Sequence, residues 1–407
     1  MTPGPVFLLW YLALRRRYAA AAVIGGFAVG FFVLTGDATF PVAMVGTVGT
    51  LALLGFGALG RALADLAAAE VVAIVVSLSV SVVPQGAAMT YSPQTGLSDA
   101  FSYDDENALE TSLFSADQRL SIAGSMELSS TVRWTVQSER ARYWRVAAYD
   151  LYTGDGWVRR AEARQDRNAL GSPLSSRGQI RQRFVAESRI NTMPAAWRPT
   201  AVDGGVGSNA LVTDFGGLQP EQPLEAGDSY TVVSAPVDAS PRQLQQAGTD
   251  YPERITDRYT QLPDSTPNRV TRRATTLTSR AETPYETAVV VENWLKSEYN
   301  YSLDVPRPSD NVADTFLFEM DRGYCTYFAT TMAVMLRSQG IPARVVVGYT
   351  PGEQVSENEW VVRGYNSHAW VEVYFPEVGW VKFDPTPAGP RVEAEQEQLE
   401  GARESGD

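Results

Sequence analysis

The hydrophobic pattern of the chain begins with three long apolar runs. Residues 18–36 and 38–60 contain no charged side chain, and residues 66–84 contain only Glu70. A helix needs about 20 apolar residues to cross the hydrocarbon core of a bilayer. The pattern therefore predicts a membrane region at residues 1–84 with about three transmembrane helices.

Arginines near these runs predict their orientation. Arg15, Arg16 and Arg17 precede the first run, and Arg61 lies between the second and the third. Basic residues favour the cytoplasmic side, so three crossings leave the rest of the chain outside. A cleaved signal peptide is disfavoured because several long apolar runs follow one another. We therefore expect a multi-pass cell-membrane protein, anchored in lipid by its N-terminal helices, with an extracellular remainder.

After the membrane region the pattern changes to short alternating runs. Residues 85–120 are rich in Gly, Ser, Asp and Gln and are interpreted as a linker. The stretch "STVRWTVQ" places Val132, Trp134 and Val136 on one face of a strand, and "TGDG" is a turn between two strand-like flanks. Residues 121–240 are therefore predicted to form an extracytoplasmic antiparallel β domain. No catalytic constellation is visible in it, and a spacer or packing role is favoured over binding.

The remaining chain divides by composition into three parts. Residues 241–274 form a connecting segment, and residues 275–390 form a second folded domain with helical and strand patterns. Residues 391–407 are charged and have little apolar content. Because such a segment cannot form a core, an acidic disordered tail is predicted.

The composition excludes several classes of function. The chain has 407 residues and a net charge of −13, which makes nucleic acid an unlikely partner. Only Lys296 and Lys382 are lysines. An acidic, lysine-poor surface suggests a halophilic source, although a GC-rich genome is the simpler explanation. One cysteine and one histidine allow no internal disulfide and fall short of a structural zinc site, so neither a metal nor a cofactor is expected.

The only cysteine, Cys325, stands at the start of a predicted helix. Gly323 precedes it, Gly340 is a fitting C-terminal cap, and the apolar face of the helix consists of Phe328, Ala329, Met332, Met335 and Leu336. Free amides and partial positive charge at a helix N-terminus favour a thiolate. A lone cysteine is more often a small buried hydrophobe. Its place in the first turn, behind a glycine, favours a nucleophile instead.

The only histidine, His368, lies in the predicted strand "SHAWVEVYF", and Asp384 follows the next strand, "WVKF". Because strand side chains alternate, burying both apolar faces together puts His368 and Asp384 on one face. A loop that paired Phe375 with Trp380 would break this parity. We therefore expect an odd-length loop or a bulge near residues 376–379.

Together these residues suggest a cysteine acyl-transfer site. Cys325 would attack an amide carbonyl, His368 would protonate the leaving amine, and Asp384 would hold the imidazole in the useful tautomer. The backbone amide of Cys325 is a natural oxyanion donor. His368 as a strand-surface residue and Asp384 as a turn residue before Pro385 are the ordinary interpretations. The order and context of the three residues favour a triad.

The stretch "RGYCTYFATTMAVMLRSQGIPARVVVGY", followed by "YNSHAWVEVYFPEVGWVKFDPTP", resembles the core of the transglutaminase-like superfamily over about residues 275–388. The family's catalytic residues fall on Cys325, His368 and Asp384. The resemblance implies an α+β, papain-like core in which a helix carrying the cysteine packs on an antiparallel sheet carrying the histidine and aspartate. The preceding regions resemble membrane-anchored prokaryotic members, in which N-terminal membrane helices and a β domain come first.

The resemblance implies an enzyme that forms a thioester from a glutamine side chain or a peptide amide. The acyl group would pass to an amine or to water, and the substrate would be a protein or peptide, such as a cell-envelope protein. Such an activity is of the protein-glutamine gamma-glutamyltransferase type. The alternatives are a cysteine protease or amidase of the same fold, and a catalytically silent scaffold that binds material at the cell surface.

Overall fold

The computed structural model describes residues 109–114, 118–122, 124–160, 163–164, 170, 178–308, 311–394 and 396. All of them belong to one unit, formed by residues 96–407. The predicted transmembrane helices and most of the predicted linker and tail lie outside the described residues. Within the described ranges, no helix is both long enough and apolar enough to cross a membrane.

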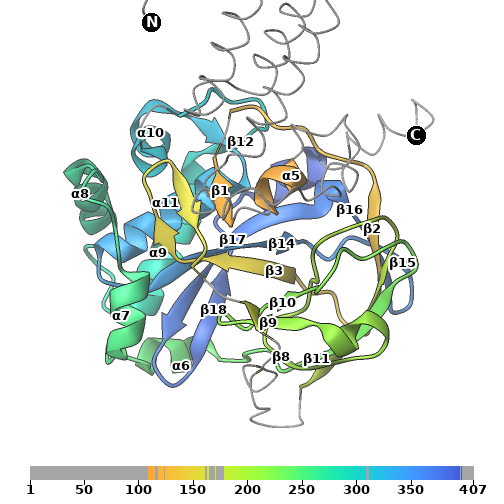
Figure 1. The fold of residues 1–407 in the computed structure, drawn as a ribbon. Helices are drawn as coiled ribbons and strands as arrows, with labels where there is room; N and C mark the ends of the chain where they lie inside the picture. Colours follow the sequence, from red (N-terminus) through yellow and green to blue (C-terminus); the bar gives the residue numbers. More distant parts are fainter. Residues whose placement is uncertain are drawn as a thin grey trace, which may run out of the picture. The chain divides into compact units, whose positions relative to one another are not determined.

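A four-stranded antiparallel sheet, in the order β18-β17-β14-β3, forms the centre of the fold (Figure 1). Its members are β3 (Trp144–Tyr149), β14 (Ala343–Tyr349), β17 (Ser367–Phe375) and β18 (Gly379–Phe383). β14 pairs with β17 on one side and with β3 on the other. A strand from the region expected to form a separate β domain therefore completes the sheet of the C-terminal region.

The C-terminal region in turn contributes strands to a second sheet, which has six strands in the order β15-β16-β2-β7-β11-β8. Its strands are β2 (Val132–Ser138), β7 (Ile180–Ala186), β8 (Pro199–Asp203), β11 (Ser229–Ser234), β15 (Glu353–Ser356) and β16 (Glu359–Arg363). The β15–β16 hairpin from the C-terminal region extends this sheet by pairing with β2. Trp134 and Val136 are fully buried, as the alternation predicts, while Val132 is half-buried.

Shorter strands complete the β structure. They are β1 (Arg119–Ser121), β4 (Leu151–Tyr152), β5 (Gly156–Val158), β6 (Ala163–Arg164), β9 (Leu211–Thr213), β10 (Leu218–Gln219), β12 (Asn300–Tyr301) and β13 (Arg322–Gly323). β4 and β5 pair across the predicted turn, where the Thr153 N–H donates to the Gly156 carbonyl at 3.0 Å. Two 3-10 helices, η2 (Gly205–Asn209) and η3 (Gly364–Asn366), lie in the connections.

The helices labelled in the described part of the chain are α5 (Leu109–Leu113), α6 (Pro241–Gln246), α7 (Glu253–Tyr259), α8 (Asn268–Leu277), α9 (Pro284–Glu298), α10 (Val312–Glu319) and α11 (Cys325–Ser338). α11 packs on β14 and β17 and is covered by α8, α9 and α10. It ends as predicted at Gly340, whose φ of 74° is easily adopted only by glycine. The Ile341 N–H then bonds the Leu336 carbonyl, and the Gly340 N–H bonds the Arg337 carbonyl.

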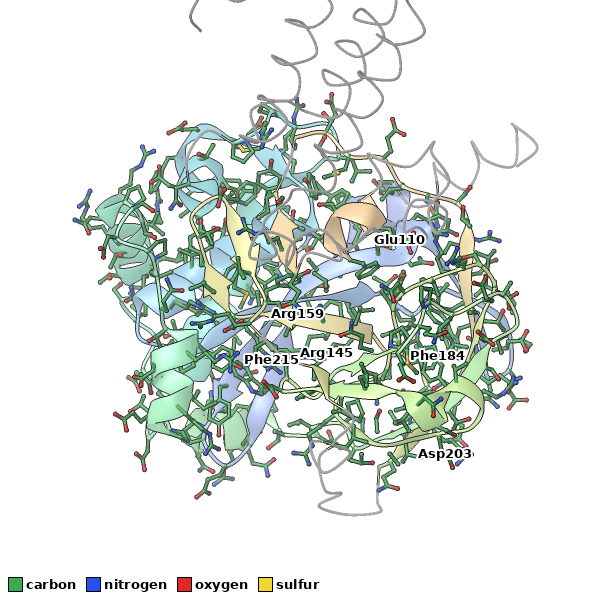
Figure 2. The ribbon with its side chains drawn as sticks, viewed as in Figure 1. Glu110, Arg145, Arg159, Phe184, Asp203 and Phe215 are labelled. Atoms are coloured by element: carbon green, nitrogen blue, oxygen red, sulfur yellow. The ribbon has the colours of Figure 1, made fainter. Side chains whose placement is uncertain are left out.

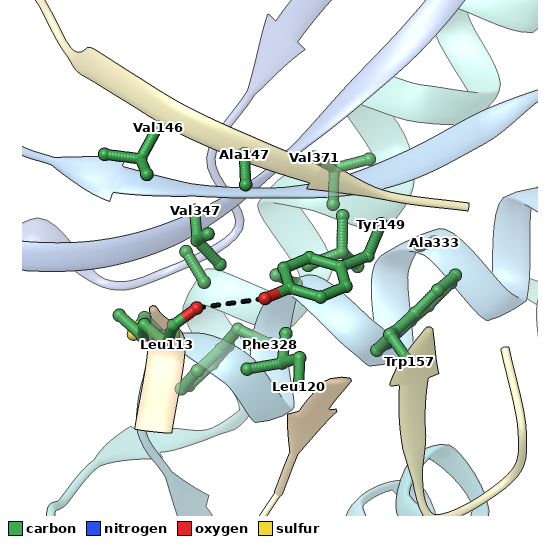
Figure 3. Close-up of a cluster of buried hydrophobic side chains, with 14 of the residues drawn as sticks. Leu113, Leu120, Val146, Ala147, Tyr149, Trp157, Phe328, Ala333, Val347 and Val371 are labelled. Atoms are coloured by element: carbon green, nitrogen blue, oxygen red, sulfur yellow. Dashed lines mark hydrogen bonds between the residues drawn. The ribbon is translucent and has the colours of Figure 1, made fainter. Parts of the chain in front are cut away.

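The main core lies between α11 and one face of the central sheet (Figure 3). Phe328 and Ala333 of α11 contribute to it, together with Val347 and Val371 of the sheet. Tyr149 donates a hydrogen bond of 3.1 Å to the carbonyl of Leu113. Although the sequence places Leu113 in a linker, α5 is therefore anchored in the folded unit.

The opposite face of the central sheet is also buried. Trp370 and Val346 point to this side and pack with Phe215, Tyr259 and Ile255 in a second, smaller cluster. Arg145 reaches across it and donates to the Phe215 carbonyl at 3.2 Å (Figure 2). His368 shares this face with Trp370, which explains why the histidine is shielded from solvent.

Candidate active site

Cys325 is the first residue of α11, with Tyr324 as the N-cap residue. The chain enters the helix through Gly323, where a Cβ atom would lie 2.7 Å from the Phe316 ring and 2.9 Å from Tyr327. Only glycine fits this turn without moving its neighbours. The Cys325 thiol is fully buried, and the nearby backbone N–H groups of Ala369 and Thr326 act to lower its pKa. The cysteine is therefore held beside the residue that follows His368.

Burial has the largest effect on the pKa values of Cys325 and His368. It raises the pKa of Cys325 to about 12, despite the two backbone donors that favour the thiolate. It also lowers the pKa of His368, because the charged imidazolium is disfavoured away from water. Both shifts favour a neutral thiol and a neutral imidazole in the resting site. The helix terminus alone does not produce the resting thiolate that the sequence suggested.

The β17–β18 hairpin places His368 beside Asp384. Phe375 pairs with Gly379, so the loop has three residues, 376–378, which confirms the predicted odd length. His368 and Asp384 consequently share a face, with Nε2 and Oδ2 2.9 Å apart. When Nε2–H donates to the carboxylate, the lone pair of the neutral ring is on Nδ1. The basic nitrogen is then the one not bound to Asp384.

Further contacts hold the Asp384 carboxylate in place. Its Oδ1 accepts the Thr386 N–H at 3.1 Å, and its own N–H donates to Glu292 Oε1 of α9 at 2.9 Å. Burial by itself would raise the pKa of Asp384. The charge and hydrogen bond of His368, with Lys382 and Tyr143, nevertheless hold this pKa well below its usual range. Asp384 is thus ionised and fixed.

Tyr143 is a site residue that the sequence did not indicate. It lies just before β3 and donates from Oη to Asp384 Oδ2 at 2.7 Å. Its ring packs edge-on against Trp370 at 5.2 Å between centroids, and the Nζ of Lys382 lies 3.6 Å from its centre. An aromatic residue at the start of a strand normally signals only packing, and no local pattern distinguishes this one.

Gly348 allows β3 to approach the site. It pairs with His368 across the β14–β17 ladder. A Cβ atom on it would lie 2.1 Å from the Trp144 carbonyl oxygen and 2.9 Å from the Trp370 ring. Glycine at this position therefore lets β3, and Tyr143 with it, lie close to the histidine.

The arrangement is chemically that of a nucleophile, a base and an orienting carboxylate. The structure brings Cys325 beside the strand that carries His368, and it joins His368 to Asp384. Among the described residues, no group of three or more His, Cys, Asp or Glu side chains is placed to hold a metal ion. Such an arrangement suits acyl transfer through a thioester.

Two family models match the chain. The model of the transglutaminase-like superfamily matches residues 271–385, and the model of the TgpA N-terminal domain matches residues 6–241. The first range contains Cys325, His368 and Asp384. The second contains Tyr143 and covers more than half of the chain.

Two individual proteins are also similar to this chain in sequence. YebA of Bacillus subtilis is 32% identical over 303 residues, which cover 65% of this chain and 40% of YebA. A protein-glutamine gamma-glutamyltransferase of Pseudomonas aeruginosa is 30% identical over 266 residues, which cover 64% of this chain and 38% of that protein. The chain thus spans about two fifths of the length of these curated relatives.

A solved structure is also similar. The crystal structure of the periplasmic domain of TgpA from Pseudomonas aeruginosa matches with a TM-score of 0.55 and 26% identity, covering 68% of this chain and 98% of that one. Its fold is the same mixture of helices and antiparallel sheets. With one family model over the site and another over most of the preceding residues, the chain belongs to the TgpA-type transglutaminase-like proteins.

Proposed function

We propose that the protein is an acyltransferase that uses Cys325, His368 and Asp384 as a catalytic triad. The observation that supports this most strongly is the single cysteine of the chain, held at a helix start beside Ala369, the residue that follows the single histidine. The hydrogen bond between His368 and Asp384 supplies the orienting contact. The relative named protein-glutamine gamma-glutamyltransferase points to a glutamine side chain as the acyl donor.

The proposed reaction has two halves. His368 takes the thiol proton at Nδ1 while the sulfur attacks the carboxamide carbon, and the Cys325 backbone N–H stabilises the oxyanion. The tetrahedral intermediate then loses ammonia, which takes its additional proton from the imidazolium, and a thioester remains. An amine attacks the thioester, gives its proton to His368 and restores the thiol. Water in place of the amine gives hydrolysis.

The buried thiol explains how the site limits side reactions. In the resting state both Cys325 and His368 are shielded from solvent and neutral. His368 takes the thiol proton as the sulfur forms its bond to the substrate carbonyl carbon, so no free thiolate needs to accumulate. Asp384 remains ionised throughout and stabilises the imidazolium that forms transiently.

The test is incorporation of a fluorescent primary amine into a glutamine peptide by the full chain. We expect ammonia release, a covalent product and an acyl-enzyme mass on Cys325. Cys325→Ala and His368→Ala should each abolish incorporation, while Gln354→Ala, on an exposed strand, should not. Ammonia release without amine incorporation would assign hydrolysis. A Cys325→Ala protein that still releases ammonia would contradict the proposal.

We further propose that the protein is anchored in the cell membrane with its catalytic part outside. The apolar runs and arginines of residues 1–84 support this, as does the similarity to a domain described as periplasmic. Protease treatment of intact cells should cleave an epitope placed after residue 396. Complete protection of that epitope would refute the proposed orientation.

A further inference from the structure

A cavity of about 720 Å³ lies beside the His368–Asp384 pair. β17 and β18 form one wall, and residues around Arg142 and Trp197 form the others. The cavity therefore lies between the central sheet and the segments contributed by the preceding region. Neither the family likeness nor the proposed chemistry assigns it a role.

Three of its lining residues connect the cavity to the candidate active site. Tyr143 lines it and donates to Asp384. Lys382 lines it and contributes to the low pKa of Asp384. Trp370 lines it and stacks beside His368, with ring centroids 6.3 Å apart. Anything bound in the cavity thus contacts side chains that themselves interact with the catalytic pair.

The charge of the cavity is opposite to that of the chain. Its lining contains four cationic residues and two acidic ones, in a protein with a net charge of −13. One of the acids, Glu372, is already bound by Arg344 at 2.8 Å and lies 3.3 Å from Arg145. Glu372 therefore does not neutralise the outer cations, which are Arg140, Arg142 and Lys382.

The lining also offers unused donors and apolar walls. Arg142 Nε and Trp197 Nε1 are buried and have no hydrogen-bond partner among the residues that the structure describes. Buried donors without acceptors are costly, so a ligand that brings acceptors would be stabilised. Trp197 and Trp380 also line the cavity, and a guanidinium lies over each ring, Arg145 at 4.5 Å and Arg344 at 4.1 Å from the centroid. The site is thus suited to a carboxylate next to an apolar group.

We propose that this cavity is a substrate subsite for an acidic polypeptide segment, with an Asp or Glu beside an apolar residue. The inference rests on the proposed function, since it takes the occupant to be part of the chain that carries the reacting carboxamide. A polypeptide fits better than a small inorganic anion, which would leave the tryptophan surfaces uncovered. Arg140 and Arg142 bind the carboxylate, and Trp197 and Trp380 contact its apolar neighbour.

The test measures binding to the full chain carrying Cys325→Ala, so that no turnover occurs. The probes are three acetylated peptides with one central glutamine and a flanking Phe, which differ only in carrying Glu, Ala or Lys next to the Phe. The Glu peptide should bind at least about tenfold more tightly than the Lys peptide. Adding Arg140→Glu and Arg142→Glu should reverse this order. Arg272→Glu, on the exposed side of α8, reverses one positive charge away from the cavity and should preserve the order.

Several results would overturn the subsite. Equal affinity for the three peptides is one, and an equal loss of the preference in the Arg272→Glu control is another. Inorganic triphosphate that binds the cavity while the peptides show no preference would indicate a general anion site. The experiment distinguishes failure of the proposed acyl transfer from failure of the proposed subsite. Selective binding without turnover by the wild-type chain would refute the acyl transfer alone, and equal turnover of all three peptides would refute the subsite alone.

Discussion

Tyr143 and Asp384, 241 residues apart in the chain, are joined by a hydrogen bond of 2.7 Å from Oη to Oδ2. The same Oδ2 lies 2.9 Å from His368 Nε2. Two donors on one oxygen share the negative charge of the carboxylate, so Tyr143 weakens the attraction of Asp384 for the imidazolium. Tyr143, which lies just before β3, thus affects His368 through a hydrogen bond to Asp384 and not only through packing.

Replacing this donor should alter the pH dependence of the reaction. In Tyr143→Phe the carboxylate loses one donor and holds the imidazolium more strongly, so the pKa of His368 rises. We expect the acidic limb of the pH–rate profile to move up by about 0.5–1 pH unit, the effect of one hydrogen bond. Tyr374→Phe removes a hydroxyl on the same face of β17 and should leave the limb unchanged. A slower enzyme with an unmoved limb would assign Tyr143 a purely structural role.

The sequence predicts where Cys325, His368 and Asp384 lie in their own elements, because each placement depends on local periodicity. The start of α11 follows from Gly323 and the apolar face, and the parity of His368 and Asp384 follows from strand alternation and an odd loop. The family assignment is confirmed by the match over residues 271–385.

The same local patterns do not indicate which distant strands pair. β3 joins β14 and β16 joins β2 through contacts between residues that are far apart in the chain. Tyr143 and the burial of Glu372 follow from that pairing. For this reason the sequence indicated neither of them. It also did not indicate that burial raises the pKa of the Cys325 thiol by more than the helix N-terminus lowers it.

The protonation of His368 can be followed directly, because it is the only histidine in the chain. Burial lowers its pKa in the folded state below the unfolded value of about 6.5. The unfolded chain therefore binds the proton more readily, and stability falls as the pH drops through about 6.5. The imidazole proton signals in NMR should titrate with a midpoint below this value.

Removing the thiol provides the control for this titration. In Cys325→Ala the buried ring keeps its surroundings, so the midpoint should remain below about 6.5. A wild-type midpoint well above 7 that falls in Cys325→Ala would instead reveal a thiolate–imidazolium pair. That result would contradict the neutral resting site.

The buried ion cluster of Glu372, Arg344 and Arg145 should contribute strongly to the free energy of unfolding. Glu372 is almost fully buried and is the counter-ion of Arg344 and Arg145, and burial lowers the pKa of Arg145 to about 10. Glu372→Gln leaves two buried guanidinium groups without a carboxylate, which should lower the free energy of unfolding by about 3–5 kcal/mol. Denaturant unfolding followed by tryptophan fluorescence measures this. Glu357→Gln, at an exposed turn, should cost almost nothing, and similar values for both variants would refute the prediction.

Gly348→Ala tests whether the approach of β3 keeps Tyr143 on Asp384. The new Cβ atom would lie 2.1 Å from the Trp144 carbonyl oxygen, so β3 must move away from His368. We expect a loss of about 1–3 kcal/mol in stability from this overpacking. The acidic limb of the pH–rate profile should also move in the same direction as in Tyr143→Phe.

A double substitution tests whether Gly348→Ala acts through the Tyr143–Asp384 hydrogen bond or only through steric strain in β3. If Gly348→Ala already breaks the contact between Tyr143 and Asp384, adding Tyr143→Phe should shift the limb no further. Gly389→Ala, where no atom lies within 4 Å of the added Cβ, is the matched control and should leave the limb unchanged without lowering the unfolding midpoint. Fully additive shifts in the double variant would show that β3 can move without releasing Tyr143. The position of β3 and the protonation of His368 would then be independent.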